Sequence, residues 1–226
     1  HRALSQFGIH RLRLIGTGRE FDQLREYLPD DEYGDINWKA TARRSKLQAK
    51  VFEPVVSLNV LIALNAATEE FAWQGSNLRL FERSVTVAAS VAKYCADRSY
   101  SFGLVSNSVA VFSGKWVNVP ASKSNMQIGL VLESLARVGP YAVSSLPEVL
   151  RAQRSAFRSG TVVALVTAVM TPALVEEIAE IRGKGYLVIV FYAGNGGPRI
   201  DVPDVPVHLM GRALEALERD DQVLAE

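Results

Sequence analysis

The sequence lacks the residues from which several common active sites are built. Its 226 residues include one cysteine, Cys95, so no intramolecular disulfide can form. The three histidines are scattered, without metal-ligand spacing and without a neighbouring cysteine, and no serine lies in a G-x-S-x-G nucleophile motif. These absences argue against a disulfide-rich secreted domain, a zinc site and a serine hydrolase. We expect Cys95 to be a small buried residue in a protein from a reducing compartment.

The sequence also lacks a charge imbalance and long apolar runs. Lysine and arginine number 25 and aspartate and glutamate 24, so the net charge of +1 does not favour nucleic acid or an anionic membrane as partner. The longest apolar runs, such as residues 161–170, are shorter than the roughly 18 to 20 residues that span a bilayer. No secretory signal opens the chain, and we expect a cytoplasmic protein. Because it begins with histidine, we expect a piece of a longer polypeptide.

From residue 55 onward, strand-like and helix-like segments alternate. Runs rich in valine, leucine and isoleucine predict strands buried on both faces, and apolar residues at intervals of three and four predict helices. The predicted strands are 55–66, 100–108, 160–168, 186–194 and 205–210, with a hairpin or irregular edge at 110–122. The predicted helices are 79–99, 124–138, 145–157, 171–185 and 211–225. This order predicts a Rossmann-like three-layer α/β domain over residues 55–226, with helices on both faces of the sheet.

Local signals define the ends and faces of these helices. Thr171 followed by Pro172 predicts a helix start, and the positions of Ser124 and Ser145 predict two further N-caps. In the helix at 79–99, an apolar face is expected to cover the sheet, with charged residues on the solvent side. That charged set comprises Arg79, Glu82, Arg83, Lys93 and Asp97.

Residues 1–54 differ from the rest, with short β-type pieces such as RLRLI at 11–15 followed by a charge-rich stretch. We expect an amino-terminal extended arm packed on the core. The segment GTGREF at 16–21 has Phe21 where a dinucleotide-binding fingerprint needs glycine, so a loop is expected there. Within residues 24–44, aromatic and charged residues are interleaved, which fits either a solvated arm with local ion pairs or an interaction surface. The candidates for such a surface are Arg25, Tyr27, Asp31, Trp38, Lys39 and Arg43.

Residues 20–53 read EFDQLREYLPDDEYGDINWKATARRSKLQAKVFE. They resemble the pattern E-F-x-x-L-R-E-Y-x-x-G-D-x-x-R-x-I-x-W-K-x-S-A-R, followed by F-E, of the bacterial domain-of-unknown-function 58 (DUF58) family. Asp30 replaces the glycine of this pattern, Gly34 the arginine and Thr41 the serine. The resemblance implies a von Willebrand factor A-like core.

In such domains a metal-ion-dependent adhesion site uses a D-x-S-x-S segment after a core strand, and later a threonine and an aspartate. This sequence has Asn65, Ala67 and Glu69 in place of the first three, and Ala168 where the family often has aspartate. Mg²⁺ is held by oxygen ligands with carboxylate help, and alanine supplies no side-chain oxygen. The resemblance therefore implies a degenerate metal-ion-dependent adhesion site, and we expect no metal and no other cofactor.

The resemblance further implies association with MoxR-type AAA+ ATPases, which act in the maturation or assembly of other proteins. It also implies that the full-length protein is membrane-anchored and that this segment is its soluble part. The leading hypothesis is thus a protein-interaction module that is not an enzyme. One alternative is an enzyme acting on a small molecule or nucleotide through the strand-end loops, and another is a metal-dependent adhesion domain. The polar groups available to such an enzyme are Asn65, Thr68, Glu69, Ser106, Asn107 and Thr167.

Overall fold

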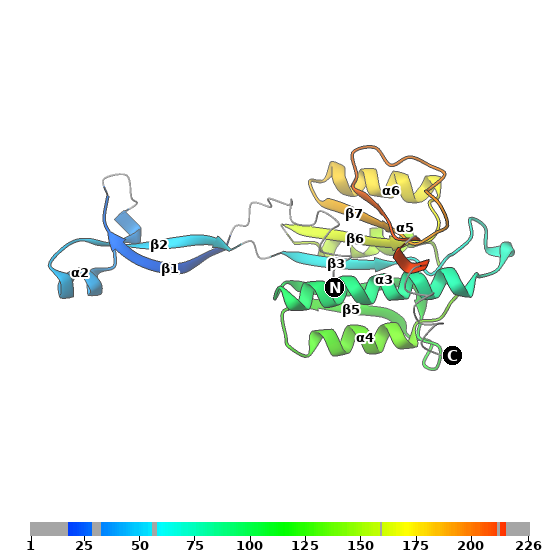
Figure 1. The fold of residues 1–226 in the computed structure, drawn as a ribbon, viewed down its shortest axis with the longest axis horizontal. Coiled ribbons are helices and arrows are strands. Elements are labelled where there is room, and N and C mark those ends of the chain that lie inside the picture. Colours follow the sequence, from blue (N-terminus) through cyan, green and yellow to red (C-terminus); the bar gives the residue numbers. More distant parts are fainter. Residues whose placement is uncertain (1–17, 29–32, 56–57, 159, 212, 216–226) are drawn as a thin grey trace. The chain divides into compact units, whose positions relative to one another are not determined.

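The computed structural model describes residues 18–28, 33–55, 58–158, 160–211 and 213–215 (Figure 1). The described residues before position 56 form one compact unit, and those from Leu58 onward form a second. The predicted strand at 11–15 and all but the first turn of the predicted helix at 211–225 lie outside the described residues.

The smaller unit is a two-stranded hairpin that carries a short helix. Strand β1 (Gly18–Glu26) pairs antiparallel with β2 (Gln48–Val55), and between them lie a 3₁₀ turn, η2 (Tyr33–Asp35), and helix α2 (Trp38–Arg44). Asn37 caps α2 by accepting a hydrogen bond from the Ala40 N–H at 3.1 Å. The loop predicted at 16–21 is wrong from Gly18 onward, because strand pairing with a segment some thirty residues later overrides the local glycine signal.

The larger unit contains a six-stranded sheet with the order β5-β4-β3-β6-β7-β8. Every neighbouring pair is parallel except β4 and the edge strand β5, which are antiparallel. The chain therefore starts in the middle of the sheet at β3, builds outward to one edge, and returns to build the other. The strands are β3 (Asn59–Leu64), β4 (Ser101–Val109), β5 (Trp116–Ser122), β6 (Thr161–Thr167), β7 (Leu187–Tyr192) and β8 (Val207–Leu209).

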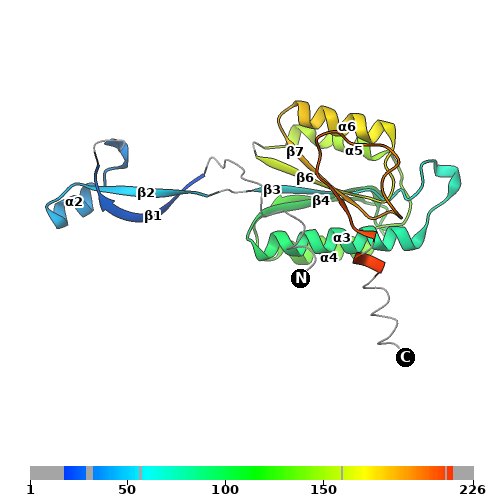
Figure 2. The ribbon, with the colours of Figure 1, turned by 45° about the horizontal axis from the view of Figure 1, so that its top comes forward.

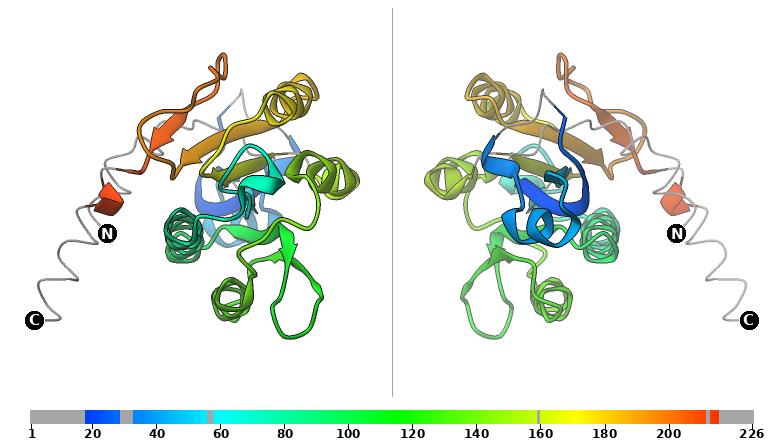
Figure 3. Two further views of the ribbon diagram at one scale, coloured as in Figure 1. Left: turned by 90° about the vertical axis from the view of Figure 1, so that its right-hand side faces the viewer. Right: turned by 90° about the vertical axis from the view of Figure 1, so that its left-hand side faces the viewer.

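Helices cover both faces of this sheet (Figures 2 and 3). Helices α3 (Leu78–Asp97) and α4 (Gln127–Arg137) pack on one face. Helices α5 (Leu146–Gln153) and α6 (Pro172–Gly183) pack on the other, with the 3₁₀ turns η3 (Ala72–Gln74) and η4 (Arg154–Ala156) in the connections. The predicted three-layer α/β architecture is confirmed. None of the described helices is both long and apolar enough to cross a membrane.

The helix ends follow the predicted capping chemistry at two of three sites. The Ser145 and Thr171 side chains accept hydrogen bonds from the N–H groups of Glu148 and Leu174. The Ser124 prediction is wrong, because α4 begins at Gln127 and the Ser124 hydroxyl instead accepts from the Met126 N–H at 3.2 Å. This bond closes a local turn before the helix and competes with capping.

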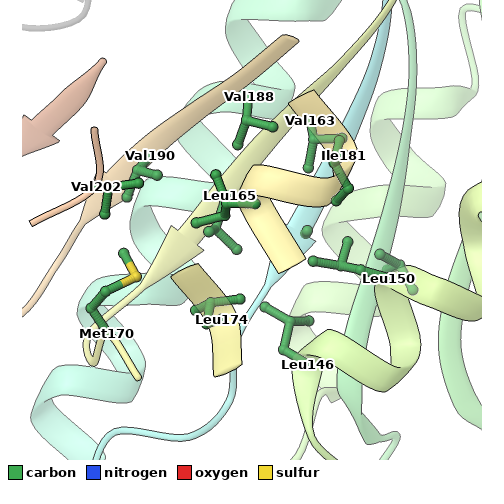
Figure 4. Close-up of a cluster of buried hydrophobic side chains, with 13 residues drawn as sticks. Leu146, Leu150, Val163, Leu165, Met170, Leu174, Ile181, Val188, Val190 and Val202 are labelled. Atoms are coloured by element: carbon green, nitrogen blue, oxygen red, sulfur yellow. The ribbon is translucent and has the colours of Figure 1, made fainter. Parts of the chain in front are cut away.

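One hydrophobic core cluster lies between the sheet and helices α5 and α6 (Figure 4). Leu174, Ile178 and Ile181, spaced at intervals of three and four on α6, are almost completely buried against strands β6 and β7. Burial of each such side chain contributes about 1.5 to 3 kcal/mol. The parallel strands are apolar on both sides, as the second helix layer requires.

The edge of the sheet depends on a glycine in β4. A Cβ atom at Gly103 would lie 2.5 Å from the Val119 carbonyl oxygen and 2.7 Å from the Ala121 backbone nitrogen. The register between β4 and β5 shifts at this point. Only glycine lets β5 approach this closely, which explains a glycine inside a core strand.

One predicted surface residue of α3 is buried. Arg83 was assigned to the charged outer face, but only 4% of it is exposed. Its guanidinium donates to Asn195 Oδ1 at 3.1 Å and lies 3.7 Å from the Glu215 carboxylate. The partners come from the loop after β7 and from the end of the described chain, so the helical pattern alone could not reveal them.

Candidate functional site

A cleft of about 650 Å³ lies at the carboxyl ends of β3, β4 and β6. The left view of Figure 3 faces this end of the sheet. Strand order reverses at β3, and open α/β sheets bind ligands at such a reversal. The volume falls within the range of small-molecule and peptide side-chain sites. Three loops form the walls, and the lining residues lie in 65–71, 75–76, 140–147 and 169–174, together with Asn107.

The floor of the cleft is a closed hydrogen-bond network of side chains. Asn65 Nδ2 donates to Thr167 Oγ1 at 3.0 Å, and Asn65 Oδ1 accepts from Asn107 Nδ2 at 3.0 Å and from the Ala67 N–H at 3.1 Å. Asn107 Oδ1 accepts from the Ala66 N–H at 2.8 Å. All three side chains are buried, and each of their nitrogen and oxygen atoms makes at least one hydrogen bond within the protein. They are therefore poorly placed to bind anything else.

The structure brings three of the four sequence-predicted metal-site positions to the cleft. Asn65, Ala67 and Glu69 line it, whereas Ala168 is buried and is not part of the lining. Of these positions only Glu69 contributes a carboxylate. In the described part of the chain, no three histidine, cysteine, aspartate or glutamate side chains lie close enough together to hold a metal ion.

Other polar residues near the strand ends have structural roles. Thr68 Oγ1 accepts from the Asn77 N–H at 2.8 Å, which fixes the residue that caps α3. Ser106 Oγ accepts from the Ser108 N–H within β4. Ser144 Oγ is different, because it is buried and has no hydrogen-bond partner among the described residues. Sequence reasoning had no signal for Ser144, which lies in the loop before α5.

The rim of the cleft is aromatic and exposed. The rings of Phe71 and Trp73 stack with centroids 6.0 Å apart and an interplanar angle of 13°, and 81% of Trp73 is accessible to solvent. A reciprocal turn holds them, in which the Phe71 N–H donates to Gln74 Oε1 at 2.9 Å and the Gln74 N–H to the Phe71 carbonyl at 3.0 Å. Tyr141 and Val143, also exposed, stand on another rim loop. The sequence predicted neither the stacked Phe71–Trp73 pair nor the exposed apolar rim of the cleft.

Hydrogen bonds join the two rim loops to each other and one of them to strand β4. The Ser76 hydroxyl donates to the Pro140 carbonyl at 2.5 Å, and Asn107 Nδ2 donates to the Ser144 carbonyl at 3.1 Å. The exposed apolar side chains are thus presented by anchored loops. Such pre-organised aromatic groups are the usual anchors of protein interfaces.

The predicted interaction residues of the smaller unit have mixed environments. Trp38 opens α2 with 66% of its surface exposed, and Lys39 and Arg43 are exposed on the same helix. Tyr27 lies with its ring 5.9 Å from that of Tyr33. Arg25 Nη1 donates a hydrogen bond to the Glu26 carbonyl at 3.0 Å. Asp31 lies outside the described residues.

Both interpretations of this unit keep some support. A local ion pair joins Lys46 Nζ to Glu26 Oε1 at 2.7 Å, as expected for a solvated arm. Exposed pairs of this kind contribute little to stability. The exposed Trp38 beside basic residues fits an interaction surface.

Comparison with known proteins gives relatives of undefined activity. The chain is 31% identical over 83 residues to the uncharacterized protein YeaD of Bacillus subtilis (strain 168), a match that covers 37% of this chain and 19% of that protein. The chain therefore spans only about a fifth of the length of this curated relative.

Solved structures give distant similarities. The BatB protein of Bacteroides thetaiotaomicron is 17% identical with a TM-score of 0.40, over 60% of this chain and 66% of that chain. An aerotolerance-related membrane protein from Bacteroides fragilis NCTC 9343 is 16% identical with a TM-score of 0.40, over 70% of this chain and 84% of that chain. Manganese-loaded TRAP protein of Plasmodium vivax is 12% identical with a TM-score of 0.36, over 71% of each chain.

The family comparison covers much more of the chain. The sequence profile of the family described as "Protein of unknown function DUF58" matches residues 23–193, which include α2, the hairpin strand β2 and the sheet as far as β7. Because this match extends over well more than half of the chain, the protein belongs to the DUF58 family.

Proposed function

We propose that this chain is a non-catalytic protein-interaction module that docks a partner on the strand-end cleft and its aromatic rim. The partner proposed is a MoxR-type AAA+ ATPase, and the role is in maturation or assembly of other proteins. The observation that carries the proposal is a contrast within one site. The polar floor is occupied by its own hydrogen bonds, whereas the rim exposes Phe71, Trp73 and Tyr141.

The buried floor of the cleft carries no group suited to catalysis, which leaves Glu69 and Glu70 as the carboxylates among the described lining residues. A general base or nucleophile needs a titratable or activated group within hydrogen-bond reach of substrate. The floor residues Asn65, Asn107 and Thr167 carry amides and a hydroxyl, and the Thr167 hydroxyl donates to the Val169 carbonyl at 2.6 Å. His208, the one histidine in the described segments, lies in β8 against Phe191 and does not line the cleft.

The same network argues against a tight metal site. A divalent ion here would have to displace the bonds that Asn65 Oδ1 and Thr167 Oγ1 make to neighbouring N–H groups. It would gain a carboxylate only from Glu69 or the adjacent Glu70. We expect no micromolar binding in calorimetric titrations with Mg²⁺ or Mn²⁺. Micromolar affinity would instead favour the metal-dependent adhesion domain, and stabilisation by a nucleotide in a thermal-shift screen would favour the enzyme.

The partnership is tested by a pull-down with the cognate MoxR-type ATPase in its nucleotide-bound state. The variant Phe71→Ala/Trp73→Ala removes the stacked pair, and we expect it to weaken binding by at least about tenfold, as for an interface anchor. Phe112→Ala is the control, because Phe112 is aromatic and even more exposed but lies on the β4–β5 turn outside the cleft lining.

The pull-down results distinguish a wrong partner from a wrong docking surface. Absence of any interaction between the wild-type chain and the nucleotide-bound ATPase would refute the partnership. Equal binding by wild type and the Phe71→Ala/Trp73→Ala variant would show that the partner docks elsewhere, and α2 with Trp38 would be the next surface to substitute.

A further inference from the structure

The cleft has a net negative charge that the proposed docking role does not by itself explain. Among the described residues that line it, Glu69 and Glu70 are the only charged ones. Within the described part of the chain neither carboxylate forms an ion pair, although lysine and arginine are common in this protein. The cleft therefore offers two acidic groups beside an aromatic wall, and none of its described lining residues supplies a cation.

We propose that the cleft receives an arginine or lysine side chain from a protein partner. This inference rests on the proposed docking function and specifies the chemistry of the docked segment. A carboxylate and a stacked aromatic pair form the environment that a cationic side chain prefers, through charge-assisted hydrogen bonds and cation–π attraction. Glu69, Glu70 and Phe71 are consecutive, so a single loop presents both elements to the cleft.

The remaining lining suits the stem of such a side chain. Val143, Leu146 and Pro147 supply apolar wall for methylene groups. Arginine has five N–H donors in a planar fork and can bind two carboxylates together, whereas the ammonium group of lysine is a compact point charge. We therefore expect arginine to bind more tightly than lysine.

Charge complementarity also excludes the opposite ligand. A bound Mg²⁺ would make this end of the sheet attractive to a carboxylate from a partner. With Asn65 and Ala67 in place of metal ligands and with Glu69 and Glu70 at the rim, an acidic side chain would be repelled. The substitutions thus reverse the sign of the preferred ligand.

The direct test is an NMR titration of the full chain with N-acetyl-arginine methylamide. We expect saturable shifts of the backbone amides of Glu69, Glu70 and Val143, with a dissociation constant in the range of about 1 to 10 mM that is ordinary for a single residue. The neutral analogue N-acetyl-citrulline methylamide has nearly the same shape, and we expect no saturable shift with it. No response to the arginine compound, or an equal response to both, would overturn the proposal.

Two matched variants assign the effect to the cleft. Glu69→Gln/Glu70→Gln keeps the shape and removes both charges, and it should weaken binding of the arginine compound by at least about fivefold. Glu82→Gln/Glu176→Gln makes the same net charge change at exposed residues that do not line the cleft, and it should leave affinity within about twofold. Equal weakening by both variants would show a non-specific charge effect and contradict the proposed site.

Failure of this inference is distinguishable from failure of the docking function. If Glu69→Gln/Glu70→Gln binds the ATPase as wild type does while Phe71→Ala/Trp73→Ala does not, docking stands and the basic ligand is refuted. If the arginine titration succeeds but the ATPase is not captured, the cleft binds a basic segment of another protein.

Discussion

The hydrogen-bond network under the cleft should stabilise the larger unit, and Asn107→Ala is the substitution that tests it. Asn107 is 1% exposed and makes three hydrogen bonds, accepting from the Ala66 N–H and donating to Asn65 Oδ1 and the Ser144 carbonyl. Truncation leaves the completely buried Ala66 N–H without this partner, which costs about 2 kcal/mol, and the two lost donor bonds add about 1 kcal/mol. We expect the free energy of unfolding to fall by about 3 kcal/mol.

This loss is large relative to the roughly 5 to 15 kcal/mol that stabilises an ordinary domain, and it corresponds to a fall of about 10 °C in Tm. Urea unfolding should be followed by far-UV circular dichroism, because all three tryptophans are largely exposed and report burial poorly. Asn118→Ala, at an exposed position on β5, is the control and should change stability by less than about 0.5 kcal/mol. A loss below about 1 kcal/mol for Asn107→Ala would refute the network as a stabilising element.

Three further predictions concern other parts of the larger unit. Burial raises the pKa of the Cys95 thiol to about 12. The folded protein at neutral pH should therefore resist thiol-labelling reagents and react only when urea unfolds it. Rapid labelling of the folded protein would contradict the burial of Cys95. The hydrogen bond and charge of Arg154 lower the pKa of Glu180 below its usual 4.5. The ionised Glu180 carboxylate therefore contributes to stability above pH 4.5, and this contribution is lost as the pH falls through the lowered pKa of Glu180. Glu180→Gln should flatten that part of a plot of unfolding free energy against pH. An unchanged plot would show that the Arg154–Glu180 ion pair does not stabilise the protein. Gly103→Ala should lower the free energy of unfolding by about 2 kcal/mol or more, because its Cβ would collide with the Val119 carbonyl, and a neutral result in urea unfolding would show that β5 can move away.

Local chemistry was sufficient to predict most elements of the larger unit. Apolar runs without polar alternation identified the buried parallel strands, and Thr171 with Pro172 identified the start of α6. These signals act within a few residues of the element they specify. Arg83 shows where such signals fail, because its partner Asn195 is 112 residues away. A periodicity argument assigns every charged residue of an amphipathic helix to solvent unless a distant partner is known.

The candidate site was predicted in position but only partly in content. The rule that strand ends converge placed Asn65 and Glu69 at one edge of the sheet, and the structure gives them a common cleft. The bond from Asn65 to Thr167 spans 102 residues, and the anchoring of the rim loop by Ser76 and Pro140 spans 64. Hydrogen bonds between residues so far apart in the sequence depend on which loops meet at the end of the sheet. No local sequence pattern specifies which loops those are.

Asn65 stands where the D-x-S-x-S pattern has its aspartate, and its amide makes a hydrogen bond that a carboxylate could not make. A carboxylate at this position could only accept hydrogen bonds, so it could not donate to Thr167 Oγ1. The Asn65 amide supplies that donor at 3.0 Å, and the Asn107 amide supplies another to Asn65 Oδ1 at the same distance. These two amides thereby join the carboxyl ends of β3, β4 and β6 by hydrogen bonds. Under the proposal above, the cleft recognises its ligand through Glu69 and Glu70, so this network and the proposed ligand use different side chains.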